Sequence, residues 1–310
     1  MTLVPHSFFS DTMVLRYLLP GCLVLPVCLL MLGCGSGDDT PGSEDAEVSA
    51  LQEHRVAATE PENVQETFRV ASDFEMQLLA AEPMVVDPVA LTYGENGLAY
   101  VAEMRDYPYA DAETAQDWAE QTNQAPLGRI RVLEDTDGDG RFDESTIFAD
   151  SLSWPTGIAV WQGGIYVTAA PHIWYLKDAT GDHKADVRQK VYTGFRKYNI
   201  QATINNLRYG LDHKIYGAGS TNGGMITSVG NPGADTVELS RNDFRFDPIT
   251  GDFERLSGAG RYGHTFDNEG NRFIASPYRP FMHAVVPFRY LERNSFIQVE
   301  TALSDVADVD

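Results

Sequence analysis

Cysteine is scarce in this sequence of 310 residues, and its few positions are clustered near the start. The three cysteines are Cys22, Cys28 and Cys34, so no residue after Cys34 can form a disulfide within the chain. The chain also has no C-x-x-C-H motif, which attaches haem in c-type cytochromes. These absences exclude a disulfide-stapled fold beyond Cys34 and a covalently bound haem in this chain.

Positive charge is scarce too: 23 Lys and Arg residues stand against 45 Asp and Glu residues, for a formal net charge of −22. A chain this acidic repels the phosphate backbone, which argues against DNA or RNA as a partner. Cations, neutral sugar-like substrates and basic proteins remain compatible partners. The G-x-S-x-G nucleophile motif, the H-E-x-x-H zinc motif and the P-loop are missing as well.

The N-terminus has the pattern of an export signal. Arg16 supplies a weak positive region, and the apolar run over 23–32 is too short to span a bilayer. The run ends in Met-Leu-Gly-Cys at 31–34, which resembles a bacterial lipobox. We therefore predict a lipoprotein signal peptide over residues 1–33, with Cys34 as the acylated first residue of the mature protein. An uncleaved anchor is the alternative, and both place the chain at a membrane of the cell envelope, facing the periplasm or the exterior.

The segment after the signal differs in composition from the rest. Residues 34–66 are acidic, rich in small residues and poor in aromatic ones. Such a composition cannot bury enough apolar surface to build a core, so we predict a flexible tether. Helical periodicity is nearly absent further on, and the best helical candidate is a polar stretch at 110–122.

From residue 67 onward, short apolar runs alternate with turns, and one pattern recurs. Each copy has an apolar run, a turn rich in Gly, Asp, Asn or Lys, and a second run with an aromatic residue, which is typical of a β-hairpin. Two further strand-like runs separate successive copies, and four-stranded units at this period are typical of propeller blades. We therefore predict an all-β fold, a β-propeller over residues 67–310, with a β-sandwich as the alternative. The four copies lie at residues 86–103, 154–169, 205–219 and 261–276.

About four blades are visible, and the sequence stops without a closing strand. A propeller joins its last blade to its first, because closure removes the open sheet edges. We therefore expect an incomplete ring or a short ring of four or five blades.

Carboxylates crowd into the stretch 134–144, where glycines separate them. Four aspartates take positions 1, 3, 5 and 9 of a calcium-binding loop, and Gly140 takes position 6, where the sharp turn needs a positive φ. The flanks are strand-like and Thr146 stands at position 12, so the loop is not an EF-hand. We predict a calcium-stapled β-hairpin, with a solvated acidic turn as the alternative. The predicted ligands are Asp135, Asp137, Asp139 and Asp143.

A second loop, at 178–186, repeats this outline with Asp178, Asp182 and Asp186. Thr180 replaces one carboxylate, and His183 replaces the turn glycine. We therefore expect this loop to bind metal poorly and take it chiefly as evidence of a repeat.

Several strings of this sequence resemble one known family. They include GRIRVLEDTDGDGRFDESTIFADSLSWPTGI at 128–158, VTAAPHIWYLKD at 167–178 and GNRFIASPYRPFMHAVVP at 270–287. Together with others from Phe68 to the end, they resemble the N-terminal propeller of membrane-bound dehydrogenases that are abundant in planctomycetes. That family is distantly similar to soluble quinoprotein glucose and sorbosone dehydrogenases, which are six-bladed propellers that bind pyrroloquinoline quinone.

The resemblance implies an exported, membrane-tethered quinoprotein-like dehydrogenase that oxidises a sugar or polyol and passes electrons to a c-type cytochrome. In such enzymes a histidine takes the proton of the substrate hydroxyl, while Arg and Lys side chains stabilise the quinone oxygens. Relatives often carry this histidine before the third hairpin, where this chain has Gln201 and Ala202. The departure favours the alternative function, a non-catalytic, calcium-stabilised propeller that binds a glycan or a protein partner.

Five residues are candidates for the site. His264 and Arg261 are candidate catalytic residues, because they stand at the start of the fourth hairpin, which we expect to face the central channel. Glu103, Arg105 and Asn205 are candidate cofactor-binding residues at the ends of hairpins. An ion-pair network is the alternative for Glu103 and Arg105, and ordinary turn chemistry is the alternative for Asn205.

Overall fold

The structure is a computed structural model, and it describes residues 59–107, 126–231, 233–293, 296 and 302–306. The predicted signal peptide, Cys34, most of the predicted tether and the predicted helix at 110–122 lie outside these residues. The described residues belong to one compact unit, Thr59–Asp310. Within them, no helix has both the length and the apolar character needed to cross a membrane.

Helices are few and short in the described chain. The 3-10 helix η1 (Pro61–Thr67) has a proline in its first turn and buries none of its residues, and it occupies the end of the predicted tether. The other two are the 3-10 helix η2 (Ile200–Ala202) and the α-helix α3 (Phe288–Glu292). Strands make up most of the remaining regular structure, which confirms the all-β prediction.

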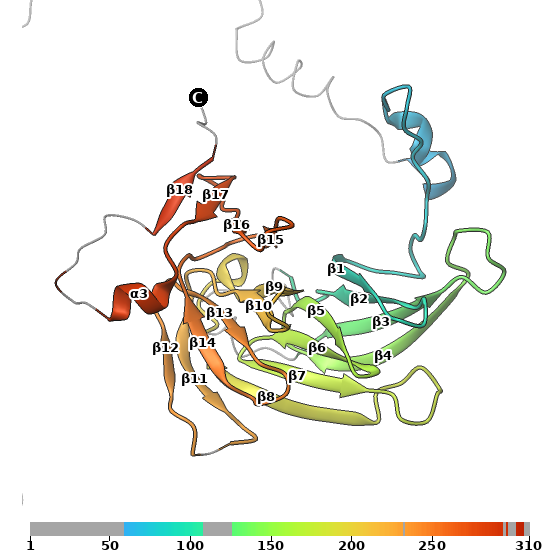
Figure 1. Ribbon diagram of the computed structural model, residues 1–310. Coiled ribbons are helices and arrows are strands. Elements are labelled where there is room, and N and C mark those ends of the chain that lie inside the picture. The colour runs from blue at the N-terminus through green and yellow to red at the C-terminus, as the bar shows by residue number, and fades with distance from the viewer. Residues whose placement is uncertain (1–58, 108–125, 232, 294–295, 297–301, 307–310) are drawn as a thin grey trace, which may run out of the picture. The chain divides into compact units, whose positions relative to one another are not determined.

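Four antiparallel sheets make up the described chain (Figure 1). The first sheet consists of β1 (Pro88–Tyr93), β2 (Ala99–Glu103), β3 (Gly128–Glu134) and β4 (Glu144–Leu152). The second is built on β5 (Pro155–Trp161), β6 (Gly164–Ala169), β7 (His172–Lys177) and β8 (Val187–Phe195). The third consists of β9 (Asn205–Tyr209), β10 (Ile215–Ala218), β13 (Asp243–Phe246) and β14 (Phe253–Leu256). The fourth consists of β15 (His264–Phe266), β16 (Arg272–Ile274), β17 (Met282–Ala284) and β18 (Leu303–Asp305).

One hairpin departs from the expected four-stranded units. Strands β11 (Gly224–Ser228) and β12 (Val237–Leu239) lie between β10 and β13 in the chain, yet β11 pairs with β8. The hairpin therefore extends the second sheet to six strands. Because its pairing partner belongs to the preceding blade, this insertion ties the second and third blades together through backbone hydrogen bonds.

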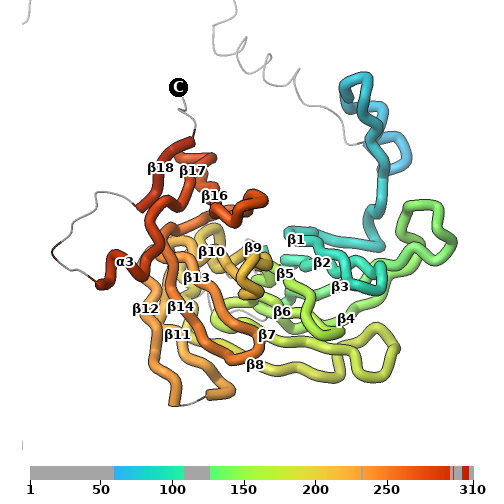
Figure 2. Tube along the Cα trace, in the orientation of Figure 1, coloured from blue at the N-terminus to red at the C-terminus, as the bar shows by residue number. Residues whose placement is uncertain are grey.

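The sheets are arranged as propeller blades. The first strand of each sheet is the inner one, and β1 contacts β5, which in turn contacts β9. The repeated segments of the sequence are the inner hairpins β1–β2, β5–β6, β9–β10 and β15–β16. Figure 2 follows the same succession of sheets along the chain. The β-propeller prediction is confirmed over the two-sheet sandwich, and within the described residues no strand pairing joins the fourth sheet to the first.

Apolar side chains between neighbouring blades form the core. One cluster joins the first and second sheets around Ile130, Leu152 and Ile165, all fully buried. A second cluster joins the second and third sheets and is rich in rings, with Phe244 stacked on Phe253 at 5.2 Å between centroids. The core therefore lies between blades and leaves the inner strands free to line an axial space.

Candidate functional site

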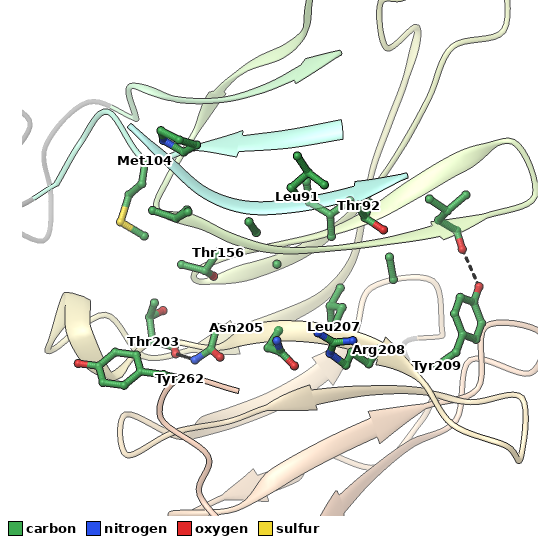
Figure 3. A pocket seen from close by; sticks show the side chains of 18 of the residues that line it. Leu91, Thr92, Met104, Thr156, Thr203, Asn205, Leu207, Arg208, Tyr209 and Tyr262 are labelled. Atoms are coloured by element: carbon green, nitrogen blue, oxygen red, sulfur yellow. Dashed lines mark hydrogen bonds between the residues drawn. The ribbon is translucent and has the colours of Figure 1, made fainter. Parts of the chain in front are cut away.

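A cavity of about 1720 Å³ lies along the inner strands (Figure 3). Its lining comes from three successive inner strands, β1, β5 and β9, and from Thr265 and Phe266 of β15. Residues of η2 and of the segment before β15 complete one end. The cavity is therefore the axial space of the propeller, the position at which larger propellers and barrels hold their ligands.

The cavity has two long walls that face each other. Figure 3 shows Leu91 and Thr92 of β1 on one wall and Leu207, Arg208 and Tyr209 of β9 on the facing wall. The Tyr209 hydroxyl donates to the carbonyl of Val160 at 2.7 Å, which ties β9 to β5. Burial, with Glu95 and Tyr175 as further causes, raises the pKa of Tyr209 to about 12. This phenol therefore stays protonated and acts as a hydrogen-bond donor at neutral pH.

Polar side chains gather at one end of the cavity. The Arg261 Nε donates to the carbonyl of Gln201 at 3.1 Å, and the Gln201 Nε2 donates to the Tyr107 hydroxyl at 3.1 Å. The Asn205 Nδ2 donates to the carbonyls of Thr203, at 3.0 Å, and of Arg261, at 3.1 Å. These bonds hold the backbone and the guanidinium of Arg261 in place. Arg261 and Asn205, two of the predicted site residues, are thus brought together in the cavity.

His264 does not face the cavity, contrary to our expectation. It begins β15 and is only 5% exposed, whereas the next two residues of the strand line the cavity. Its ring lies edge-on to Tyr216 and Phe266, and neither ring nitrogen has a hydrogen-bond partner among the described residues. Burial, with the positive charges of Arg272 and Arg208, lowers the pKa of His264 to about 3. This imidazole is therefore a neutral core side chain that does not share a surface with Arg261.

Glu103 and Arg105 do not form a common site with Asn205. Glu103 is fully buried, and its carboxylate accepts from the Arg131 Nε at 2.6 Å and from the Val86 backbone N–H at 2.9 Å. The ion-pair alternative therefore holds for Glu103, which ties β2 to β3. Arg105 lines a separate small cavity of about 290 Å³, away from the residues of the axial cavity.

The first carboxylate loop joins β3 to β4, as predicted, but with three converging aspartates. Carboxylate oxygens of Asp135, Asp137 and Asp143 lie within 4.8 Å of one another, a spacing that could hold a metal ion. Asp139 is not in this group, and its Oδ1 accepts from the Arg141 N–H at 2.7 Å. The loop therefore brings together three of the four predicted ligands.

The second carboxylate loop, between β7 and β8, has the same geometry. Oxygens of Asp178, Asp182 and Asp186 also lie within 4.8 Å of one another. The three carboxylates therefore converge although this loop has Thr180 in place of a carboxylate and His183 in place of the turn glycine. Burial opposes the charged form of Asp178, but N–H groups of Gly181 and His183 outweigh it and lower its pKa. The two loops occupy the outer hairpins of successive blades and are equivalent candidates for a metal.

Sequence reasoning missed most of the cavity lining. The signal was present, because the first run of each repeated hairpin becomes an inner strand, and β1, β5 and β9 line the cavity along their length. Aromatic residues that line the cavity without having been predicted are Tyr93, Tyr107, Trp161, Tyr209, Tyr262 and Phe266. Arg208 was also missed, because an isolated arginine in a strand belongs to no recognisable motif.

The fold and the cavity define an all-β propeller with an axial ligand-sized space. The chain belongs to the family DUF7133, a domain of unknown function, whose model matches residues 60–310. No curated protein matches the chain.

Several solved structures are similar to this chain at low identity. The holo form of the pyranose dehydrogenase PQQ domain from Coprinopsis cinerea is 14% identical with a TM-score of 0.41, over 64% of this chain and 44% of that one. A gluconolactonase-type protein is 13% identical with a TM-score of 0.36, over 63% and 57% of the two chains. An ulvan lyase of family PL25 is 11% identical with a TM-score of 0.34, over 64% and 51%. The chain thus spans about half the length of the structures it matches.

Proposed function

We propose that this protein is a glycan-binding propeller whose ligand lies in the axial cavity. The observation that supports the proposal is the lining itself, which combines exposed aromatic rings with amides and hydroxyls. Rings such as Tyr93, 54% exposed, and Tyr262, 60% exposed, offer flat apolar surfaces to the C–H faces of a sugar. The Thr92 hydroxyl supplies a donor and an acceptor for sugar hydroxyl groups, and the Asn205 Oδ1 and the Thr156 hydroxyl oxygen supply acceptors.

The size of the cavity supports an extended ligand. Pockets for small molecules have volumes of about 300–1,000 Å³. The cavity here, at about 1720 Å³, is larger, and it runs along the inner strands rather than into the core. An oligosaccharide of several residues suits such a space better than a single sugar.

The lining does not fit the oxidation of an alcohol by a quinone. That chemistry needs cationic groups at the quinone oxygens and a base beside the substrate hydroxyl. Arg208 and Arg261 supply the cations, but no histidine or lysine is found among the described lining residues. The only carboxylates of the lining, Asp87 and Glu95, lie beyond opposite ends of β1. We therefore propose neither a quinoprotein dehydrogenase activity nor electron transfer to a cytochrome.

Oligosaccharide binding is expected to depend on Tyr262. The mature chain is titrated with a panel of neutral and acidic oligosaccharides by isothermal titration calorimetry. For any sugar that binds, Tyr262→Ala is expected to weaken affinity about two- to tenfold, because the ring stacks on the sugar. The matched control is Tyr278→Ala, which removes an 86% exposed tyrosine of the same sheet region that does not line the cavity. Failure of every sugar to bind would refute the proposed function.

We also propose that the two carboxylate loops bind calcium, which takes six to eight oxygen ligands. At a calcium concentration 100-fold above the dissociation constant, each site contributes about 2.7 kcal/mol, which raises the melting temperature by roughly 5–10 °C. The double variant Asp137→Ala with Asp143→Ala is expected to lose the rise in melting temperature that comes from the first loop. The double variant Asp178→Ala with Asp186→Ala is expected to lose the rise that comes from the second loop. Differential scanning calorimetry with calcium and with chelator measures both. Identical melting of the wild-type chain in the two buffers would exclude calcium.

For localisation, we propose that the chain is exported and anchored to a membrane of the cell envelope through lipid on Cys34. The pattern at 31–34 supports this proposal. Incorporation of a labelled fatty acid in cells is expected for the wild-type chain and is expected to be lost in Cys34→Ala. Equal labelling of the two chains would argue for an uncleaved anchor or for another lipid site.

A further inference from the structure

Two arginines stand out among the residues that line the axial cavity. Arg208 on β9 and Arg261 before β15 are the only basic residues in the described lining. The chain has about twice as many acidic as basic residues, 45 against 23, so cations have abundant partners. Arg131, Arg245 and Arg272 are all in ion pairs, yet the guanidinium groups of Arg208 and Arg261 form none with the described residues.

Both guanidinium groups are available to a ligand. Arg208 is exposed and lies on the wall that faces Leu91 and Thr92, which carry no charge (Figure 3). Arg261 is half-buried, and its Nε is held by the carbonyl of Gln201. Its terminal nitrogens therefore remain as donors on a side chain whose direction is already set. A fixed guanidinium loses little conformational entropy when it binds an anion.

Two carboxylates of the lining, Asp87 and Glu95, flank β1, whereas the two carboxylate loops lie away from the inner strands. Both carboxylate loops connect the outer strands of their blades, β3 to β4 and β7 to β8, whereas the cavity follows the inner strands. Two to three strand spacings separate the inner strand from the strands that carry these loops, about 10–14 Å. This distance exceeds the screening length of about 8 Å at physiological salt. The two carboxylate loops therefore do not prevent an anion from approaching the two arginines.

We infer that the ligand of the axial cavity is an acidic sugar, with carboxylate or sulfate groups that pair with Arg208 and Arg261. This inference rests on the proposed glycan binding and names the class of glycan. A carboxylate or a sulfate group has two oxygens that accept parallel hydrogen bonds from one guanidinium, whereas a neutral hydroxyl has one oxygen. The aromatic rings and amides of the lining would hold the sugar rings, while the arginines select for charge.

The test compares matched ligands that differ only in charge. Oligogalacturonate and a sulfated oligogalactan are titrated into the mature chain in calcium-free buffer, each beside its methyl-esterified or desulfated counterpart. We expect at least one acidic form to bind, and its neutral counterpart to bind at least tenfold more weakly. Arg208→Gln and Arg261→Gln are each expected to lower the affinity for the acidic form about ten- to hundredfold, with little effect on a neutral sugar.

Two controls keep the outcomes distinct. Arg241→Gln removes an arginine outside the cavity lining and is expected to leave affinity unchanged, and thermal melting verifies that each variant is folded. Tighter binding of neutral forms, or full affinity in the double arginine variant, would overturn the inference and leave glycan binding standing. Absence of binding for every acidic and neutral sugar would overturn the inference together with the proposed function.

Discussion

Replacement of Asp243 by alanine is expected to destabilise the domain by about 3–5 kcal/mol. Asp243 begins β13 and is fully buried. Its Oδ2 accepts from the Arg272 Nη1 at 2.6 Å, and its Oδ1 accepts from the N–H groups of Gly219, at 3.0 Å, and Gly260, at 2.8 Å. One carboxylate therefore joins the third blade to the fourth blade and to two loops.

The large size of this effect follows from what the substitution leaves behind. Arg272 on β16 is 8% exposed, so its charge would stay buried without a carboxylate, although it also donates to the carbonyl of Ser257. Two backbone N–H groups would lose their acceptor as well, which adds to the cost. Because a whole domain is stable by only about 5–15 kcal/mol, the variant would retain little of its stability.

Urea unfolding followed by circular dichroism measures the change in the free energy of unfolding. The matched control is Asp150→Ala, which breaks the exposed ion pair with Arg188 and is expected to cost about 1 kcal/mol or less. Asp243→Asn keeps the shape and one acceptor oxygen, so we expect an intermediate loss. A midpoint for Asp243→Ala equal to that of Asp150→Ala would show that the buried pair does not hold the blades together.

Acidic pH is expected to destabilise the fold through His264. The pKa of this buried imidazole is lowered to about 3 by burial and by Arg272 and Arg208, against about 6.5 in the unfolded chain. Above pH 6.5 both states are neutral, and the full stability is present. Between pH 6.5 and 3 the imidazole is protonated in the unfolded chain but neutral in the folded chain. The free energy of unfolding therefore falls by about 1.4 kcal/mol for each pH unit of acidification.

The contribution of His264 can be separated from those of other groups. His172 also has a lowered pKa, from burial and from Lys190, and it acts in the same pH range. Carboxylates with lowered pKa values, such as Asp178 and Asp247, add their own loss at lower pH. The comparison is therefore made between pH 6 and 4.5, where we expect His264→Phe to flatten the slope by up to about 1.4 kcal/mol per unit.

Phenylalanine suits this position because the neighbours of His264 include the rings of Tyr216 and Phe266. The control is His213→Asn, which replaces an exposed histidine with positive φ by a residue that tolerates that backbone conformation. Chemical unfolding at several pH values gives the slopes. Equal slopes for the wild-type chain and His264→Phe would mean that this histidine accepts a proton in the folded state.

The errors of the sequence analysis have a common physical cause. His264 begins β15 and is buried, whereas Thr265 and Phe266 of the same strand line the cavity. The burial of His264 depends on how β15 packs on the third blade, where the ring of Tyr216 lies against it. Glu103 was misplaced in the same way, because its partner Arg131 lies 28 positions further along the chain, on the neighbouring strand. The local sequence pattern indicates neither the burial of His264 nor the ion-pair partner of Glu103.

Local sequence patterns account for the local part of the fold. The all-β class, the four inner hairpins and the two carboxylate loops follow from alternating apolar residues, turn residues and aspartate spacing, all of which act over a few neighbouring residues. Packing of the blades determines which residues line the axis, that β11 pairs with β8, and that Arg208 and Arg261 lie in one cavity, where neither forms an ion pair with the described residues. These features depend on contacts between residues far apart in the chain, and such contacts form only when the blades pack against one another.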